Sequence, residues 1–440
     1  MSEAPSAALI DKCVHCGFCL PTCPTYMLWG EEMDSPRGRI YLMKAALDGR
    51  VPIDASYVRH FDACLGCLNC VTACPSGVQY GPLIERTRAQ IEQQYTRGFA
   101  DRLFRGVLLW FIPYPSRMRL AMLPLAVFGG LARAFAASAA GRVLPERARA
   151  ALALAPPVSL RSLFSRLPMR TAAAGEVRRK VAVLTGCVQR LAFADVNEAT
   201  VRVLAAEGCT VIVPSDQGCC GALALHAGRI DQARDLARRT IEAFERVGVE
   251  RIIVNAAGCG SAMKEYGDLF AGDPLWSARA QAFSAGVRDV SEMLVELGGS
   301  RATRQPIRAR VVYHDACHLS HGQGIRSQPR ALLQEIPGLE LVSPPEAEIC
   351  CGSAGIYNLV QPEPAAQLGA RKAANIAAMS PDLIATGNPG CILQIASAAR
   401  ALGHEWAIVH PIQIVDASIR GGEAALASIT KKGQASTGRT

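Results

Sequence analysis

Apolar residues recur every three to four positions near the start of the chain, as they do on one face of a helix. In DSPRGRIYLMKAALDG, Ser35 occupies the position of a helix N-cap and Pro36 the first helical position. We therefore expect a helix that begins at Pro36 and stops before Gly49. The segment GPLIERTRAQIEQQYTRG has the same periodicity and predicts a second helix that ends at Gly98.

The second half of the chain has a different pattern, in which short apolar runs alternate with amphipathic stretches such as IDQARDLARRTIEAFERVG and PAAQLGARKAANIAAM. This alternation is typical of α/β units on a mostly parallel sheet. The pattern occurs twice, because VAVLTGC matches VVYHDAC, QGCCGALAL matches EICCGSAGI, and IIVNAAGC matches LIATGNPGC. The offset is 130 residues from Cys187 to Cys317 and 132 residues from Cys259 to Cys391. Each repeat is long enough for a domain, so we expect a duplicated α/β domain and not a solenoid.

The middle of the chain is rich in Arg, Ala and Pro. From Arg97 to Arg170 there are twelve arginines against two acids, Asp101 and Glu146, which leaves +10, whereas the whole chain carries +9. The longest uncharged apolar run, LAMLPLAVFGGLA, has 13 residues and contains Pro124. A membrane-spanning helix needs about 20 apolar residues, so none is expected.

Two interpretations of this basic stretch stay open. It is a linker of amphipathic helices packed on a neighbouring domain, or a surface that meets a partner or the face of a membrane. A nucleic-acid site is not expected, because the arginines alternate with Leu, Ala, Phe and Pro and form no known nucleic-acid-binding motif.

The chain has 17 cysteines, and its start, MSEAPSAALIDKC, has no basic stretch followed by an apolar run. We therefore expect no secretory signal and a cytoplasmic location, with the inner face of the cytoplasmic membrane as a further option. In a reducing compartment, clustered cysteines are metal ligands or redox groups more often than disulfides.

Eight of the cysteines form two copies of one motif. CVHCGFCLPTCP and CLGCLNCVTACP both have the spacing C-x2-C-x2-C-x3-C followed by proline. Two-residue gaps let a tight loop place three thiolates around an iron–sulfur cube, and the fourth cysteine ligates the other cluster. Zinc sites or a disulfide knot are the alternatives, but zinc sites are usually built from cysteine pairs. The spacing predicts two [4Fe–4S] clusters, one bound by Cys13, Cys16, Cys19 and Cys74, and the other by Cys64, Cys67, Cys70 and Cys23.

Two such clusters carry single electrons and cannot take a hydride from an organic substrate. The segment nearest to a dinucleotide-binding motif, HGQGIRS, ends in serine and follows a Cys-His pair, so we do not interpret it as one. A flavin or another two-electron centre is therefore expected on a different chain.

The duplicated region places cysteines at corresponding strand ends, where α/β folds build their sites. We expect a redox or metal site in each repeat, with buried apolar packing as the alternative. The residues are Cys187, Cys219, Cys220 and Cys259 in the first repeat, and Cys317, Cys350, Cys351 and Cys391 in the second. Cys209 has no counterpart and is expected in the core. His318 is expected to be a polar loop residue, with a role as ligand or proton donor as the alternative.

With these residues together, the chain resembles the iron–sulfur subunits of glycolate oxidase, a glycolate dehydrogenase. The resemblance covers nearly the whole chain and rests on CVHCGFCLPTCPTY, DSPRGRIYLMKAALDG, CLGCLNCVTACPSGVQY and the two Cys-Cys-Gly domains. The wider family includes the iron–sulfur subunit of anaerobic glycerol-3-phosphate dehydrogenase and a heterodisulfide reductase subunit. The resemblance implies a complex with two flavin-family subunits, in which an FAD subunit oxidises glycolate to glyoxylate and this chain passes the electrons to a quinone or other acceptor.

The chain departs from its relatives at one place. The heterodisulfide reductase relatives carry a further cysteine after each Gly-Cys, where this chain has Ala262 and Gln394. A five-thiolate cluster is therefore not expected in either repeat, and an additional metal or cluster there stays an open question. The alternative functions are a disulfide reductase acting at the Cys-Cys-Gly sites, and electron transfer for another 2-hydroxy acid or for glycerol 3-phosphate.

The expected fold class is a multidomain α+β protein. A mainly helical two-cluster ferredoxin module (1–96) precedes a helical linker (97–175). Two α/β cysteine-rich domains (176–305 and 306–422) follow, and a disordered tail (423–440) ends the chain.

Overall fold

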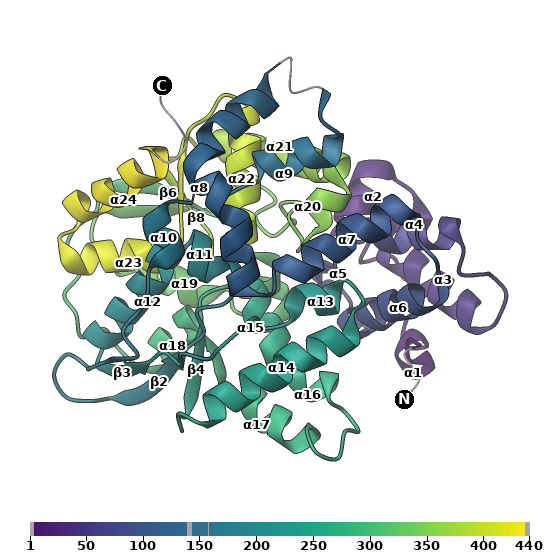
Figure 1. Ribbon diagram of the computed structural model, residues 1–440, viewed down its shortest axis with the longest axis horizontal. Coiled ribbons are helices and arrows are strands. Elements are labelled where there is room, and N and C mark those ends of the chain that lie inside the picture. Colours follow the sequence, from purple (N-terminus) through teal and green to yellow (C-terminus); the bar gives the residue numbers. More distant parts are fainter. Residues whose placement is uncertain (1–3, 139–142, 157, 436–440) are drawn as a thin grey trace.

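The N-terminal module is helical and packs against both α/β domains. The computed structural model describes residues 4–138, 143–156 and 158–435, and Figure 1 shows this module at one side of the molecule, where α6 contacts α13 and α2 contacts α21. The elements of the module are α1 (Ala7–Ile10), α2 (Pro24–Trp29), η1 (Glu32–Asp34), α3 (Pro36–Leu47), α4 (Ala55–Ala63), α5 (Asn69–Thr72) and α6 (Tyr80–Gln94).

Helix α3 confirms the first predicted helix, because the Ser35 side chain accepts a hydrogen bond from the Gly38 N–H at 3.0 Å. Helix α6 ends at Gln94, before the predicted end at Gly98. The backbone is extended at Tyr95, and Arg97 turns back to donate to Glu92 at 2.7 Å. The apolar periodicity of the sequence does not reveal the contact of Arg97 with Glu92, so it predicted a helix that was too long.

Four helices connect the module to the sheets: α7 (Phe99–Phe111), α8 (Pro115–Ala137), α9 (Glu146–Ala153) and α10 (Leu160–Phe164). Pro124 lies inside α8. Helix α8 packs on α10 and α11, and α9 packs on α20 and α21. Among the described residues, no helix is both long and apolar enough to cross a membrane.

Two sheets with the same strand order confirm the duplicated α/β fold. The order is β3-β2-β4-β5 in the first sheet and β7-β6-β8-β9 in the second, and these strands are all parallel. A short strand, β1, adds to the first sheet antiparallel to β3 and lies within the predicted linker, before residue 176. The strands are β1 (Arg170–Thr171), β2 (Arg179–Val183), β3 (Cys209–Ile212), β4 (Arg251–Val254), β5 (Val287–Asp289), β6 (Ala309–Tyr313), β7 (Leu339–Val342), β8 (Leu383–Ala385) and β9 (Ala407–Val409).

Helices cover both sheets. Those of the first domain are α11 (Val188–Ala192), α12 (Ala194–Ala206), α13 (Ala222–His226), α14 (Ile230–Glu245), α15 (Ala257–Lys264), α16 (Tyr266–Leu269), α17 (Ser277–Gly286) and α18 (Val290–Glu296). Those of the second are the π-helical turn η3 (His318–Gly322), α19 (Ser327–Gln334), α20 (Tyr357–Val360), α21 (Pro362–Ala377), α22 (Pro389–Ala401), α23 (Pro411–Arg420) and α24 (Glu423–Ala435).

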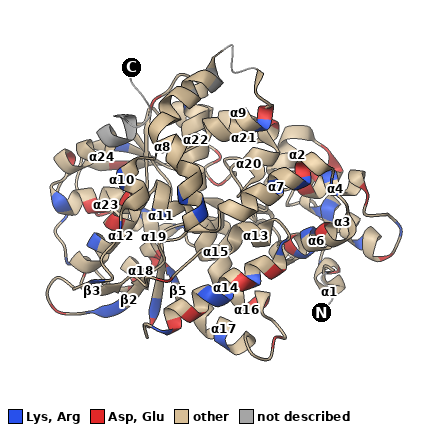
Figure 2. Ribbon diagram, viewed as in Figure 1, with Lys and Arg blue, Asp and Glu red and all other residues tan. Residues whose placement is uncertain are grey.

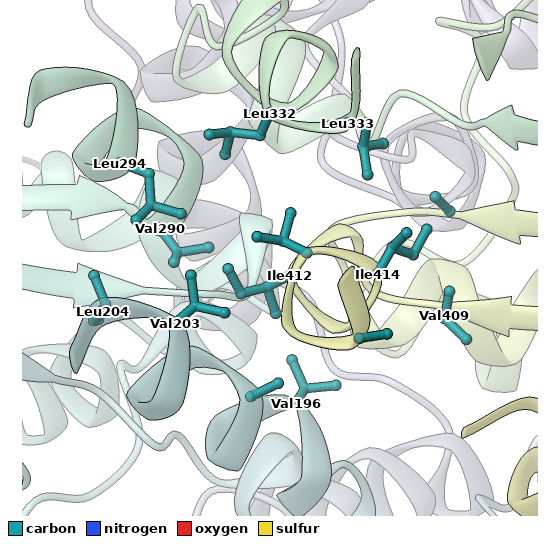
Figure 3. Close-up of a cluster of buried hydrophobic side chains, with 14 of the residues drawn as sticks. Val196, Val203, Leu204, Val290, Leu294, Leu332, Leu333, Val409, Ile412 and Ile414 are labelled. Carbon is teal, nitrogen blue, oxygen red and sulfur yellow. The ribbon is translucent and has the colours of Figure 1, made fainter. Parts of the chain in front are cut away.

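One apolar core joins the two repeats. Figure 3 shows side chains of α12, α18 and α19 gathered around Ile412 and Ile414 of α23. The same cluster contains Val181 of β2 and Val311 of β6, so it reaches both sheets. Because cores are closely packed, this shared cluster fixes the strand ends of the two repeats relative to each other.

The prediction of a disordered tail was wrong for Glu423–Ala435, which forms α24. Leu426 is buried in the shared core and Ile429 packs against it. The Glu423 carboxylate also accepts a hydrogen bond from the Arg308 N–H. Apolar contacts therefore hold a segment whose composition indicated disorder, and residues 436–440 lie outside the described part of the chain.

Candidate iron–sulfur and cysteine sites

Two neighbouring cavities in the N-terminal module are lined by the eight cysteines of the paired motifs. The two cavities share Pro36, Cys70 and Tyr80 as wall residues. Groups bound in them would therefore lie next to each other. The first cavity is lined by Cys13, Cys16, Cys19 and Cys74 besides the shared Cys70, and the second by Cys23, Cys64, Cys67 and Cys70.

These cavities suit the crossed ligand sets. All 17 cysteines are described, and each carries a free thiol. Apart from Cys70, which both cavities share, the first cavity receives three cysteines from the first motif and Cys74 from the second. The second cavity receives three from the second motif, including Cys70, and Cys23 from the first, and four such thiolates are the donor set of a [4Fe–4S] cube. Burial raises the pKa of the Cys19 thiol to about 11, so cluster assembly there must displace a proton. The assignment of each cysteine to a cluster stays a prediction.

The two motif loops have the same backbone conformation. Each has a left-handed residue two positions after its first cysteine, His15 with φ 54° and Gly66 with φ 62°. Each has another directly after its second cysteine, Gly17 with φ 88° and Leu68 with φ 62°. Non-glycine residues adopt this conformation only where the surroundings impose it. The two loops are therefore folded alike around their cavities although they share few side chains.

A buried arginine lies at the second cavity. Arg39 of α3 is 1% exposed and lines this cavity. Its guanidinium donates to the His60 carbonyl at 2.7 Å, to the Thr25 hydroxyl at 3.1 Å and to the Asp34 carboxylate at 3.2 Å. His60 Nδ1 lies 2.9 Å from the same carboxylate. The network connects α3 to α4 and places a positive charge beside thiols that become thiolates when metal binds.

We expect Arg39→Met to lower the free energy of unfolding by about 3–5 kcal/mol, because it leaves the Asp34 carboxylate buried without its cation. Thermal unfolding under anaerobic conditions measures this loss. The matched control is Lys44→Met on the same helix, whose exposed ion pair with Asp11 is worth about 0–1 kcal/mol. Equal effects of the two substitutions would contradict the structural role of Arg39.

The first cysteine-rich domain brings its cysteines together at the ends of β2, β3 and β4. The Sγ atoms of Cys187 and Cys219 are 3.5 Å apart. Interaction with the thiols of Cys219 and Cys259 lowers the pKa of the buried Cys220 thiol well below its usual value. The Tyr266 hydroxyl donates to the Cys220 carbonyl at 2.6 Å and fixes the backbone of the double cysteine.

Glycine is required after both double cysteines. Gly221 and Gly352 have φ values of 82° and 92°. A Cβ atom would lie 3.0 Å from the Ala233 carbonyl oxygen at the first position and 2.7 Å from the Ala365 carbonyl oxygen at the second. The Cys-Cys-Gly turn therefore packs directly on α14 in the first repeat and on α21 in the second.

The second cysteine-rich domain repeats this arrangement and adds two histidines. Interaction with the thiols of Cys350 and Cys391 lowers the pKa of the Cys351 thiol well below its usual value. His318 Nδ1 lies 3.5 Å from Cys317 Sγ, so the ring contacts the site, and its role there stays a prediction. His314, which the sequence pattern did not single out, lies beside Cys351 and Cys391. Its signal was the spacing His-x-x-Cys in YHDAC.

The second cluster cavity adjoins the second cysteine-rich domain. Cys67 of the cavity and Cys317 and Cys350 of the domain belong to one apolar cluster. The Thr72 hydroxyl and His321 Nδ1, 2.9 Å apart, connect the same two regions. Cys209 lies elsewhere, fully buried on β3 in the shared core, as predicted.

Comparison with known proteins agrees with this organisation. Residues 9–78 match the 4Fe-4S dicluster domain, and residues 181–264 and 311–396 match the cysteine-rich domain. The chain is 40% identical over 389 residues to the probable glycolate oxidase iron-sulfur subunit of Bacillus subtilis, which covers 87% of this chain and 88% of that protein. The chain belongs to the family of glycolate oxidase iron–sulfur subunits.

Other relatives extend this family assignment. The glycolate oxidase iron-sulfur subunit of Escherichia coli is 35% identical over 417 residues, which cover 94% of this chain and 95% of that protein. Lactate utilization protein A of Oceanobacillus iheyensis is 30% identical over 245 residues, 56% of this chain and all of that protein. The match to the dicluster domain confirms the predicted pair of [4Fe–4S] clusters in the N-terminal module.

Proposed function

We propose that this chain is the electron-carrying subunit of a flavin-dependent glycolate dehydrogenase. The observation that carries the proposal is a pair of adjacent cavities lined by eight cysteines, in a chain closely similar to glycolate oxidase iron–sulfur subunits. Oxidation of glycolate to glyoxylate releases two electrons and two protons, and a flavin accepts the electron pair. Iron–sulfur clusters transfer one electron at a time, so two neighbouring clusters suit the division of that pair.

The flavin belongs to the partners in this proposal. We infer a complex with two flavin-family subunits, one of which binds FAD and oxidises glycolate. The acceptor is a quinone, which takes up two electrons and two protons to become a quinol, or another compound that accepts two electrons. Within this chain, the motif cysteines hold the clusters, and Arg39 places a positive charge at the second one.

The Cys-Cys-Gly sites are proposed to act between the clusters and the acceptor. The apolar cluster that contains Cys67 and Cys317 excludes water between the second cavity and the second cysteine-rich domain. Buried thiols then line this domain from Cys317 to Cys351 and Cys391. The first domain holds the equivalent thiols, Cys187 and Cys219 among them, in its own core.

A second candidate is electron transfer for a different 2-hydroxy acid, and the similarity to lactate utilization protein A favours it. A third, a disulfide reductase at the Cys-Cys-Gly sites, would show thiol–disulfide activity in this chain alone. Co-purification with the flavin subunits followed by flavin analysis tests the proposal. We expect FAD on the partners and glycolate oxidation only by the complex. Flavin bound to this chain, or faster oxidation of lactate than of glycolate, would contradict it.

The linker helices present an apolar face that nothing in the described chain covers. On α7, Phe99, Leu103, Val107 and Trp110 are exposed at helical spacing. Figure 2 shows charges of both signs along α6 and α14, whereas most of α8 is uncharged. The arginine charge of this region is partly neutralised, since Arg97 pairs with Asp62 and Glu92 of the N-terminal module. We propose that this face attaches the chain to a flavin subunit or to the membrane surface through apolar contact.

We expect the double substitution Leu103→Asp and Val107→Asp to weaken that attachment at least tenfold. Burial of each side chain is worth about 1.5–3 kcal/mol, and 1.4 kcal/mol is about tenfold in affinity. Binding to the flavin subunits and to anionic lipid vesicles measures the loss and identifies which of the two the face meets. Leu275→Asp, at an exposed leucine elsewhere, is the control. If binding to the flavin subunits and to the vesicles is unchanged, the four helices serve only as a linker.

A further inference from the structure

His314 is a buried imidazole whose ring nitrogens have no oxygen or nitrogen partner among the described residues. It directly follows β6, three residues before Cys317, and is 1% exposed. The thiol of Cys351 is close enough to interact with the ring, but neither Nδ1 nor Nε2 makes a hydrogen bond of normal geometry with a described residue. A buried polar group left unpaired is costly, so such groups are retained where they have a function. An imidazole at this place therefore indicates a ligand that binds its ring nitrogen.

Two thiols from other strand ends meet this imidazole. One ligand atom each of His314, Cys351 and Cys391 lies within 4.8 Å of the other two, and all three residues are buried. Ligand atoms bound tetrahedrally to one zinc ion at about 2.0–2.3 Å are about 3.3–3.8 Å apart. Side-chain movements of about 1 Å would therefore close the three ligand atoms around a single ion.

The ligand types define the class of ion. Two thiolates and an imidazole suit zinc or ferrous iron, whereas calcium and magnesium require oxygen ligands. Cys350 is the sequence neighbour of Cys351, and its thiol interacts with the thiols of Cys351 and Cys317. Gln394, which replaces the additional cysteine of the relatives, is not available, because its amide donates to the Ala365 carbonyl at 2.8 Å and accepts from Asn358 at 3.0 Å.

The first repeat lacks the imidazole. Leu184 occupies the position that corresponds to His314, and it packs against Cys187, Cys219 and Cys220 in an apolar cluster. Among the described residues, the group around His314 is the only set of three or more His, Cys, Asp or Glu side chains close enough to share an ion. The two cysteine-rich domains therefore differ in what they can bind.

We propose that His314, Cys351 and Cys391 form a metal site for one thiophilic divalent ion in the second cysteine-rich domain, and that the first domain has no equivalent site. The ion would hold both thiols as thiolates beside Cys317, at the side of the domain that adjoins the second cluster cavity. A part in electron transfer rests on the proposed function. The presence of the metal does not, because it is measured without turnover.

The test counts metal in the full chain, purified anaerobically and then exposed to Zn²⁺ alone and desalted. We expect one ion per chain besides about eight irons of the two clusters. His314→Leu should lose that one ion and keep the irons. This variant places in the second repeat the residue that the first repeat has at the same position, so the packing is expected to tolerate it. His314→Cys, which restores a ligand, should keep the ion.

Cys220→Ser, in the first repeat, is the matched control for Cys351→Ser. Cys220→Ser should keep the additional ion, and Cys351→Ser should lose it. The proposal is overturned if no ion beyond the cluster irons is bound, if more than one is bound, if His314→Leu retains it, or if Cys220→Ser loses it. None of these results bears on glycolate-driven reduction of the clusters, which tests the proposed function separately.

Discussion

Replacing Cys74 with serine is expected to destroy the cluster whose other three cysteines belong to the first motif. Cys74 lines the cavity of Cys13, Cys16 and Cys19, although it comes from the second motif. Serine is a poor ligand for a soft iron–sulfur centre, so a cube that needs four thiolates loses one of them. About four of the eight irons should be lost, and the remaining signal in electron paramagnetic resonance should be that of the second cluster.

Cys23→Ser is the reciprocal experiment. Cys23 lines the other cavity, with Cys64, Cys67 and Cys70, so its loss should remove the second cluster and leave the first. Cys209→Ser provides the control, because Cys209 is fully buried in the shared core, far from either motif in the fold. It should keep all the iron. If each substitution instead damages the cluster of its own motif, the ligand sets are not crossed.

Cys351→Ser is expected to abolish turnover with the natural acceptor while leaving both N-terminal clusters intact. The second cysteine-rich domain adjoins the second cluster cavity through the apolar cluster that contains Cys67, Cys317 and Cys350, and the Cys351 thiol interacts with that of Cys350. Its partners set a low pKa for the thiol, which favours the thiolate that metal binding and redox chemistry require. Acceptor reduction by the intact complex, and iron content, are the two measurements.

Cys220→Ser makes the same change in the first repeat. Cys220 shares an apolar cluster with Cys187 and Cys219, whereas Cys317 and Cys350 of the second repeat share one with Cys67, so a smaller effect on turnover is expected. Loss of partner binding in both variants, with the clusters retained, would indicate structural sites. Full activity in both would refute a redox function of the Cys-Cys-Gly residues.

The two iron–sulfur clusters of the N-terminal module could be predicted from the sequence, because cluster ligation depends on the spacing of cysteines within short motifs. Motif gaps decide which thiols share a loop, and the local signals at Ser35 and Pro36 decide where α3 begins. The repeat was equally visible, since strand ends and double cysteines recur at a nearly constant offset. The cysteine motifs and the start of α3 could be predicted because the residues that determine them are close together in the chain. The two α/β domains could be predicted because their sequence pattern occurs twice.

Features that depend on distant contacts could not be predicted. The end of α6 depends on how Arg97 meets Asp62, and the order of α24 depends on a core formed by other elements. The positive charge of the basic stretch seemed unbalanced in the sequence because Asp62 and Glu92, which pair with Arg97, lie outside it. The sequence shows His314 three residues before Cys317, but only the fold shows that Cys351 and Cys391 lie close to it. The fold also shows that the ring has no other hydrogen-bond partner among the described residues.

The most direct test of the central claim is rapid mixing of glycolate with the anaerobic complex, followed by optical and paramagnetic detection. The flavin should be reduced first, and the clusters of this chain should then accept electrons one at a time, before the acceptor is reduced. This chain alone should show no reduction by glycolate. If the acceptor is reduced at full rate while these clusters stay oxidised, or if the chain alone oxidises glycolate, the account is contradicted.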